Sequence, residues 1–241
     1  MFKTTLKFWF LIIGLFFISS CGKKSPPLSI EESIPSDFEF EVEATQAGFN
    51  LWITLPTKTQ GNYTLVSIKK LLIEKGEKSL DLPQAKERRE IIKLSPKLHS
   101  AGNLFLYSDY KLKHRHQYSY RIKIVKDFLV ETDWSPWIKV FWHNPPGLPK
   151  NFDLKILGKR KVFLTWERPP TDIFGLYLEG EVFYELFKRI ENQEKVWQLR
   201  KTEFLDEPSE NQRTCYSVRS VLNFRDTLIP GPKTPEKCVT F

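Results

Sequence analysis

From residue 38 onward, apolar and polar residues alternate along much of the chain, a pattern typical of β-strands with one buried face. In the first half, the alternating apolar positions are Phe38, Phe40 and Val42, followed by Phe49, Leu51, Ile53 and Leu55. Further strands are predicted over 63–73 and 134–140. The densely charged segment 84–93 lacks the alternation, so we expect a solvated loop or a short helix there.

The second half of the chain repeats this pattern. Its alternating positions are Phe152, Leu154 and Ile156, then Val162, Leu164 and Trp166, with further strands over 182–189 and through Tyr216, Val218 and Ser220. Residues 204–206 are expected to form a turn that leads into another strand. The linker 144–149 is rich in proline and cannot continue a hydrogen-bonded ladder. The sequence therefore predicts two β-domains of ordinary size, at 38–143 and 150–241.

The N-terminal segment follows a different pattern. An apolar run over 8–18 lies behind two lysines and is too short to cross a bilayer, which takes about 20 residues. These features are typical of a signal peptide, predicted at 1–20. The run ends in Ile18-Ser19-Ser20-Cys21, which resembles the lipobox of bacterial lipoproteins. The alternative is an uncleaved N-terminal anchor in which the cysteine is incidental.

The lipobox resemblance implies cleavage before Cys21 and a diacylglycerol on its thiol, so that membrane lipid is the first partner of the mature chain. Gly22 at the next position fits sorting to the outer membrane, in an organism that has one. Residues 21–37 combine prolines with serines and charges, which favours an extended tether. The expected location is the cell envelope.

Leu112 and Tyr118 lie six residues apart, just before an alternating run that begins at Tyr120. The pair resembles the Leu-x-Pro-x-x-x-Tyr corner of fibronectin type III domains, with His114 at the proline position. In such a corner the tyrosine packs inward and its hydroxyl bonds to upstream backbone.

Trp166 in the second half resembles the core tryptophan of the same family, whereas Thr214 stands where the corner tyrosine is expected. Together these resemblances imply an all-β fold of two tandem immunoglobulin-like, fibronectin type III β-sandwiches.

Trp134 and Trp137 belong to a segment, Trp-Ser-Pro-Trp-Ile, that resembles the Trp-Ser-x-Trp-Ser stretch of some fibronectin type III domains. The resemblance implies that cations of the neighbouring strand, here Arg121 and Lys123, interleave with the two rings. A platform for stacking sugars is the alternative interpretation of the tryptophans.

Cys215 and Cys238 are the two cysteines that remain when Cys21 is assigned to lipid. By the resemblance they fall on neighbouring strands, and an exported chain can keep a disulfide, so a bridge is expected. Two free thiols are the alternative.

Charge and composition exclude several other functions. Without Lys3 and Lys7, the formal charge of +8 falls to +6, and the charges are interspersed, so with export we expect no nucleic acid partner. His114 and His116 share one face of an extended segment but have no third ligand nearby in sequence, so no metal site is predicted. No catalytic motif is recognised, and we expect neither a cofactor nor an enzyme.

The sequence therefore favours a non-catalytic, lipid-anchored envelope protein that acts as a protein–protein interaction, adhesion or assembly scaffold. An envelope protein is its expected second partner. Binding of glycan or lipopolysaccharide, through the basic balance and the two tryptophans of 134–137, is the alternative.

Overall fold

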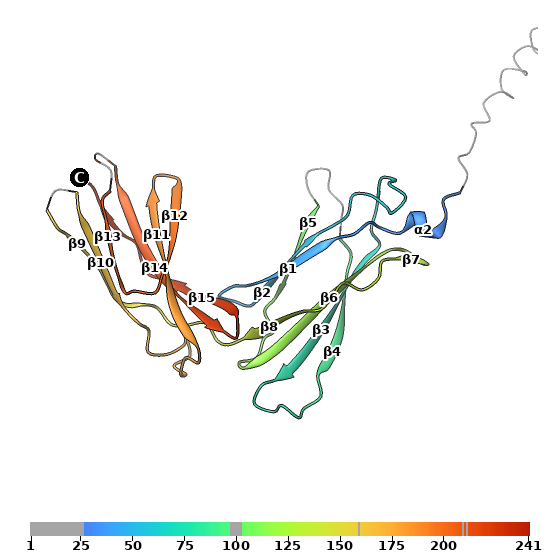
Figure 1. Ribbon diagram of the computed structural model, residues 1–241, viewed down its shortest axis with the longest axis horizontal. Coiled ribbons are helices and arrows are strands. Elements are labelled where there is room, and N and C mark those ends of the chain that lie inside the picture. The colour runs from blue at the N-terminus through green and yellow to red at the C-terminus, as the bar shows by residue number, and fades with distance from the viewer. Residues whose placement is uncertain (1–26, 97–102, 159, 209, 211) are drawn as a thin grey trace, which may run out of the picture.

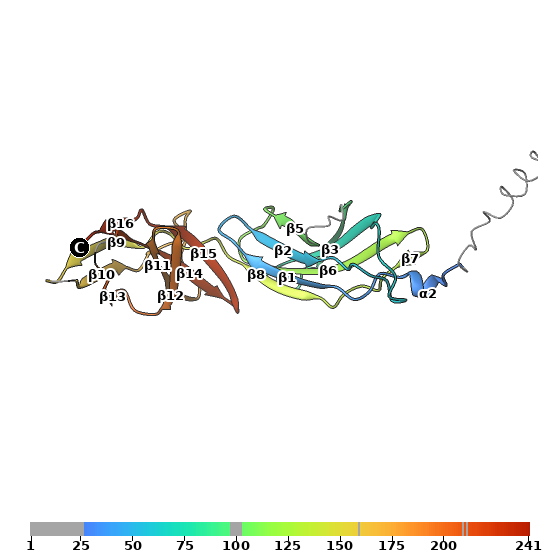
Figure 2. The ribbon, with the colours of Figure 1, turned by 90° about the horizontal axis from the view of Figure 1, so that it is seen from above.

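The computed structural model of the 241-residue chain describes residues 27–96, 103–158, 160–208, 210 and 212–241. It contains two β-sandwiches arranged end to end, with a bend between them (Figures 1 and 2). Strands β1–β8 build the first sandwich, and strands β9–β16 build the second. Within the described residues, no helix has the length and apolar character that crossing a membrane requires.

The first sandwich packs a small sheet against a larger one, and every pairing is antiparallel. The small sheet has the order β1 (Glu39–Ala44), β2 (Phe49–Thr54) and β5 (Leu104–Asp109). The larger sheet has the order β4 (Arg88–Leu94), β3 (Lys70–Ser79) and β6 (His116–Asp127), with β7 (Val130–Glu131) and β8 (Ile138–Trp142) both paired to β6.

The second sandwich repeats this arrangement. Its small sheet has the order β13 (Glu203–Asp206), β10 (Val162–Glu167) and β9 (Lys150–Ile156). Its larger sheet has the order β12 (Gln193–Leu199), β11 (Glu181–Ile190) and β14 (Thr214–Phe224), with β15 (Thr227–Lys233) and β16 (Lys237–Val239) both paired to β14. Two antiparallel sheets of this kind, stacked face to face, are the fibronectin type III form of the immunoglobulin-like sandwich. The predicted fold class is confirmed.

The two cores lie where the alternating strands place apolar side chains between the sheets. In the first sandwich the fully buried side chains include Phe49, Leu51, Ile53, Leu71, Ile73, Tyr118, Tyr120, Ile122 and Ile124. In the second they include Val162, Leu164, Leu186, Tyr216, Val218 and Leu222. Each large apolar side chain removed from water stabilises its sandwich by about 1.5–3 kcal/mol.

Two predicted elements on the larger sheet of the first sandwich are wrong. The segment 84–93, expected to be a loop or a short helix, contains the strand β4. This strand is the outermost of its sheet and is largely exposed, so neither face imposes an alternating pattern. Charges on such an edge discourage pairing with another chain. The strand expected over 63–73 begins only at Lys70, after a looped segment with isolated bridges.

Two further predictions need correction. The last strand of the first sandwich begins at Ile138 rather than at residue 134, because Pro136 has no N–H to donate to a ladder. Residues 204–206, expected to form a turn, belong to the strand β13 instead, where Leu205 pairs with Phe163 of β10.

Part of the segment predicted as an extended tether folds onto the first sandwich. A one-turn helix, α2 (Ile30–Ser33), is closed by a capping box in which Ser29 and Glu32 bond reciprocally to each other's backbone. Lys126 Nζ donates to the carbonyl of Ser33 at 3.2 Å, and Pro35 forms an isolated bridge with Thr59. Helix α2 therefore lies at the end of the first sandwich that faces away from the second (Figure 1).

The two sandwiches meet beside the segment that follows β8. The Phe141 N–H donates a hydrogen bond of 2.9 Å to Thr227 Oγ1, which joins β8 to the start of β15. Arg115, in the connection between β5 and β6, forms an ion pair with Glu179 of the second sandwich. Pro146 forms an isolated bridge with Asp172. Backbone and side-chain contacts therefore both hold the two sandwiches together at the junction.

Candidate functional site

The predicted corner residues pack at the start of β6. Tyr118 is fully buried, and its hydroxyl accepts a hydrogen bond of 2.7 Å from the Lys113 N–H, five residues upstream. Leu112 packs against the same core while remaining partly exposed. Burial raises the pKa of Tyr118 well above its ordinary value, so the phenol stays protonated. These contacts fix the entry of the chain into β6.

Trp134 and Trp137 form a ladder with cations on the outer face of the larger sheet. The Arg121 guanidinium lies between them, 4.7 Å from one ring centroid and 4.6 Å from the other. Lys123 also lies against Trp134, and Arg89 against Trp137, at 5.4 and 5.2 Å. Each indole therefore contacts two cations of its own chain, which favours a structural ladder over a platform for stacking sugars.

Side-chain hydroxyl groups accept hydrogen bonds from β6 in the stretch between its partner strands β7 and β8. Ser135 Oγ accepts from the Ile122 N–H at 2.9 Å, and Thr132 Oγ1 accepts from the Ile124 N–H at 3.0 Å. In the second sandwich, Thr234 Oγ1 accepts from the Val218 N–H at 3.0 Å. Ser135 of the Trp-Ser-Pro-Trp segment therefore takes the place of the backbone carbonyl that a neighbouring strand would offer to the Ile122 N–H.

In the second sandwich, the predicted core tryptophan Trp166 and the corner residue Thr214 are buried as well. Trp166 packs edge-on against Tyr184, with 5.6 Å between ring centroids. Thr214, at the position of the corner tyrosine, is fully buried. Cys215 and Cys238 are directly opposite each other on β14 and β16 and are joined by a disulfide. The disulfide fastens the last strand to the sheet.

Cys21, the predicted lipid attachment residue, lies outside the described residues, as does the signal peptide predicted at 1–20.

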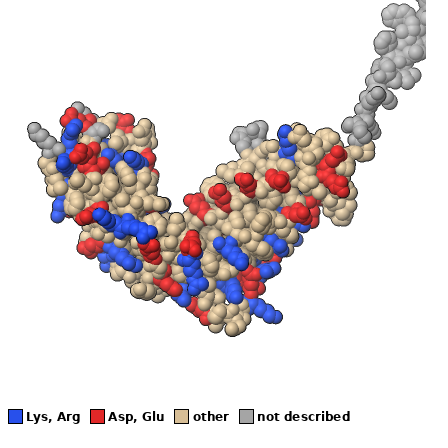
Figure 3. Space-filling view, in the orientation of Figure 1, with Lys and Arg blue, Asp and Glu red and all other residues tan. Residues whose placement is uncertain are grey.

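A groove of 1030 Å³ runs along the open edge of the first sandwich toward the second. It is lined by β1, by Trp52, Thr54 and Leu104 of the strands β2 and β5, by β8, and by residues 225–228, which span the turn after β14 and the start of β15. Glu39, Glu41 and Glu43 are the exposed side chains of β1, while Phe40 and Val42 are turned toward the core. Figure 3 shows acidic side chains in a row along this edge.

Strand β1 is the terminal strand of its sheet, so one row of its backbone N–H and C=O groups has no strand partner within the described residues. Trp52 stands beside it on β2, where its Nε1–H donates to Glu43 at 2.8 Å. An open strand edge next to a groove is a surface on which an extended peptide can add as a further strand.

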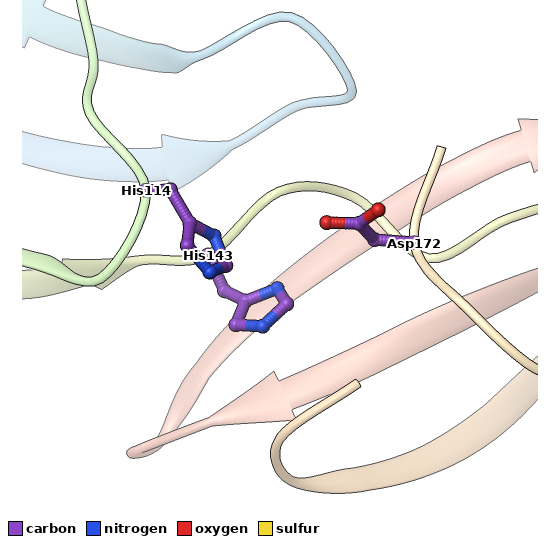
Figure 4. Close-up of side chains that lie close together, drawn as sticks. All are labelled: His114, His143 and Asp172. Atoms are coloured by element: carbon purple, nitrogen blue, oxygen red, sulfur yellow. The ribbon is translucent and has the colours of Figure 1, made fainter. Parts of the chain in front are cut away.

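The histidines are placed differently from the sequence expectation. The ring of His116 stacks near Tyr118, and its Nδ1 contacts the His114 carbonyl, so the two histidines of the predicted face do not converge. His114 instead lies against His143, with 4.3 Å between ring centroids, and Asp172 approaches from the second sandwich (Figure 4). Burial, and then the neighbouring His143, lower the pKa of His114.

Sequence reasoning missed this cluster because its members come from three distant segments. His143 follows β8, His114 precedes β6 and Asp172 lies in the connection between β10 and β11. The only sequence signal is that His143 borders the proline-rich linker, where both sandwiches must meet.

No protein-family model matches this chain, and none of the curated proteins matches its sequence. Among solved structures, the FN1–FN3 domains of chicken CNTN1 are similar, at 13% identity over 89% of this chain and 70% of that chain, with a TM-score of 0.41. The chicken interferon gamma receptor alpha chain (16% identity, 86% of this chain and 98% of that chain) has a TM-score of 0.33. A two-domain fibronectin type III segment of chicken tenascin (11% identity, 86% and 99%) also has 0.33. The fold assignment rests on the strand order given above.

Proposed function

We propose that this chain is a non-catalytic, lipid-anchored scaffold of the cell envelope that binds a protein partner along the edge of β1. The observation that carries the proposal is the open edge of this strand beside the groove, bordered by both sandwiches. Main-chain hydrogen bonds to an added strand supply affinity, and the flanking side chains supply specificity.

The chemistry of the edge suggests the kind of partner. The glutamates at positions 39, 41 and 43 place three carboxylates on one face of the edge strand β1, so a second copy of β1 would be repelled. A partner that presents an extended segment with lysine or arginine at alternate positions complements this row. Opposite charges at directly facing strand positions contribute roughly 0.2–1 kcal/mol each.

The anchoring part of the proposal rests on the Ile-Ser-Ser-Cys sequence at 18–21 and the apolar run before it. Because α2 packs on the end of the first sandwich remote from the second, a lipid on Cys21 would leave the second sandwich projecting away from the membrane. The groove then lies partway along the projecting part, accessible to a neighbour in the same envelope.

Anchoring is tested by mass spectrometry of the mature N-terminus, comparing the native chain with Cys21→Ser expressed in a bacterium. The proposal expects a peptide that begins at Cys21 and carries acyl chains, and it expects the substituted chain to stay unprocessed. A mature N-terminus elsewhere, or an unmodified thiol on Cys21, contradicts it.

Binding is tested by capture from detergent-solubilised envelopes with the native chain and with the triple variant Glu39→Lys, Glu41→Lys, Glu43→Lys. The matched control is Glu203→Lys, an exposed position on β13, the edge strand of the second sandwich's small sheet. We expect a partner that the native chain and the control recover and the triple variant loses. Equal recovery by all three chains would place the binding surface elsewhere.

A further inference from the structure

His114, His143 and Asp172 converge at the junction of the two sandwiches, and we propose that they bind one divalent transition-metal ion, with Zn²⁺ the best fit. One ligand atom from each residue lies within 4.8 Å of the others. Figure 4 shows the two imidazole rings next to each other and the Asp172 carboxylate directed toward them from the other side of the junction. This inference is independent of the function proposed above.

His143 is set up as a ligand by its hydrogen bond. Its Nδ1 lies 2.7 Å from the carbonyl oxygen of Asn144. A carbonyl can only accept, so Nδ1 carries the proton and donates, and Nε2 keeps its lone pair. A ligating histidine held in this way by a backbone carbonyl is the usual outer-shell arrangement of protein metal sites. The side chain is only 1% exposed and packs against Phe224, so its orientation is fixed.

Asp172 is likewise held in place while keeping capacity for a metal. Its Oδ1 accepts from the N–H groups of Phe174 and Leu176, both at 2.8 Å. Its Oδ2 accepts one hydrogen bond of 2.8 Å from Asn144 Nδ2. An ionised carboxylate offers about four lone-pair sites, so these three bonds leave one for a cation. The side chain is 3% exposed, and a buried carboxylate favours a positive neighbour.

His114 is the adjustable member. It is partly exposed, and its Nδ1 accepts a long hydrogen bond of 3.3 Å from the Asn144 N–H. Coordination through Nδ1 replaces this bond, and coordination through Nε2 moves the ring proton to Nδ1, so in both cases the Asn144 N–H loses this weak acceptor. Arg115, the nearest cation in sequence, is neutralised by ion pairs with Asp81 and Glu179.

Two imidazoles and one carboxylate form a ligand set that suits Zn²⁺, with water at the fourth position. With Zn–N distances of about 2.0–2.1 Å, tetrahedral ligands lie about 3.3 Å apart. The three side chains therefore have to close by an amount on the order of 1 Å, which the partly exposed His114 can provide by rotation. Because Asp172 belongs to the second sandwich, the ion would fix the angle between the sandwiches.

Isothermal titration of the metal-free full chain in detergent with Zn²⁺ tests the site. We expect one ion per chain, and binding weaker by about 100-fold or more for His114→Gln and for Asp172→Asn. The matched control, His116→Ala, removes a histidine two residues from His114 that faces Tyr118, and should leave affinity unchanged. Binding that both ligand variants retain, or binding lost only with His116→Ala, overturns the proposal, as does the absence of stoichiometric binding.

A second measurement guards against misfolding, since Asp172 also orders its own loop. The melting temperature of each variant is compared with and without Zn²⁺. A folded variant should melt at the same temperature in both conditions, whereas the native chain should melt higher with the ion, because a ligand that binds only the folded state stabilises it. Absence of a Zn²⁺-dependent shift in the native chain contradicts the proposal.

Discussion

The hydroxyl of Tyr120 donates a hydrogen bond of 2.8 Å to Asp109, and this bond crosses from the larger to the smaller sheet of the first sandwich. Lys75, directly opposite Tyr120 on β3, forms a buried ion pair with the same carboxylate. The second sandwich contains the same three residue types at equivalent positions, where Tyr216 and Lys188 both bind Asp206. A lysine–aspartate–tyrosine triad, buried in the first sandwich and partly exposed in the second, thus joins the two sheets in each sandwich.

The different burial of the two triads predicts that removing the aspartate destabilises the first sandwich more than the second. Lys75 and Asp109 are each 4% exposed, whereas Lys188 and Asp206 are 13% and 14% exposed. Removing one partner of a buried ion pair leaves an uncompensated charge, so Asp109→Ala should lower the free energy of unfolding by about 3–5 kcal/mol. Asp206→Ala should lower it by less, because water reaches Lys188. Urea denaturation measures both changes, and a larger effect for Asp206→Ala would contradict the reasoning.

Buried tyrosines predict instability at alkaline pH. Burial, and then the neighbouring carboxylates, raise the pKa values of Tyr120 and Tyr216 far above their ordinary value of 10.0. In the unfolded chain these phenols ionise near pH 10, while in the folded chain they stay protonated. The stability they contribute is therefore fully present below pH 10 and is lost as the pH rises above it.

The measurement is the free energy of unfolding between pH 8 and pH 11. Tyr120→Phe should reduce its fall above pH 10, while the exposed Tyr177→Phe serves as the matched control. An identical alkaline fall in the native chain and in Tyr120→Phe would show that other groups cause it.

The tryptophan ladder predicts a structural rather than a binding defect. Trp137→Ala removes ring contacts with Arg121 and Arg89, each worth roughly 0.5–1 kcal/mol on a partly exposed surface. We expect a loss of about 1–2 kcal/mol in the free energy of unfolding of the first sandwich. If the variant instead keeps its stability and loses affinity for envelope glycan, the rings serve as a sugar platform.

The strands that the sequence predicts correctly are those with one face in the core. Strands β2 and β10 are examples, because burial on one side forces their period of two. Strand β4 escapes prediction because it is exposed at a sheet edge, and α2 because its stability comes from a local capping box and from contacts with distant residues such as Lys126. The histidine cluster also escapes prediction, because its members are far apart in the sequence and come together only when the two sandwiches pack against each other.

The disulfide predicts a stability change confined to the second sandwich. Cys215 and Cys238 are 23 residues apart, and closing a loop of this length stabilises the folded state by about 3 kcal/mol in the chain-entropy treatment. The double variant Cys215→Ala, Cys238→Ala should therefore lower the unfolding transition of the second sandwich and leave that of the first unchanged, as calorimetry can resolve. Cys21 is kept in both chains, so the comparison is independent of lipid attachment. Strand β16 pairs with β14 only over 214–216. The amides of β16 should therefore exchange faster with solvent in the double variant than in the native chain. Equal shifts in both transitions would indicate that the sandwiches unfold as one unit through their shared junction, and not separately.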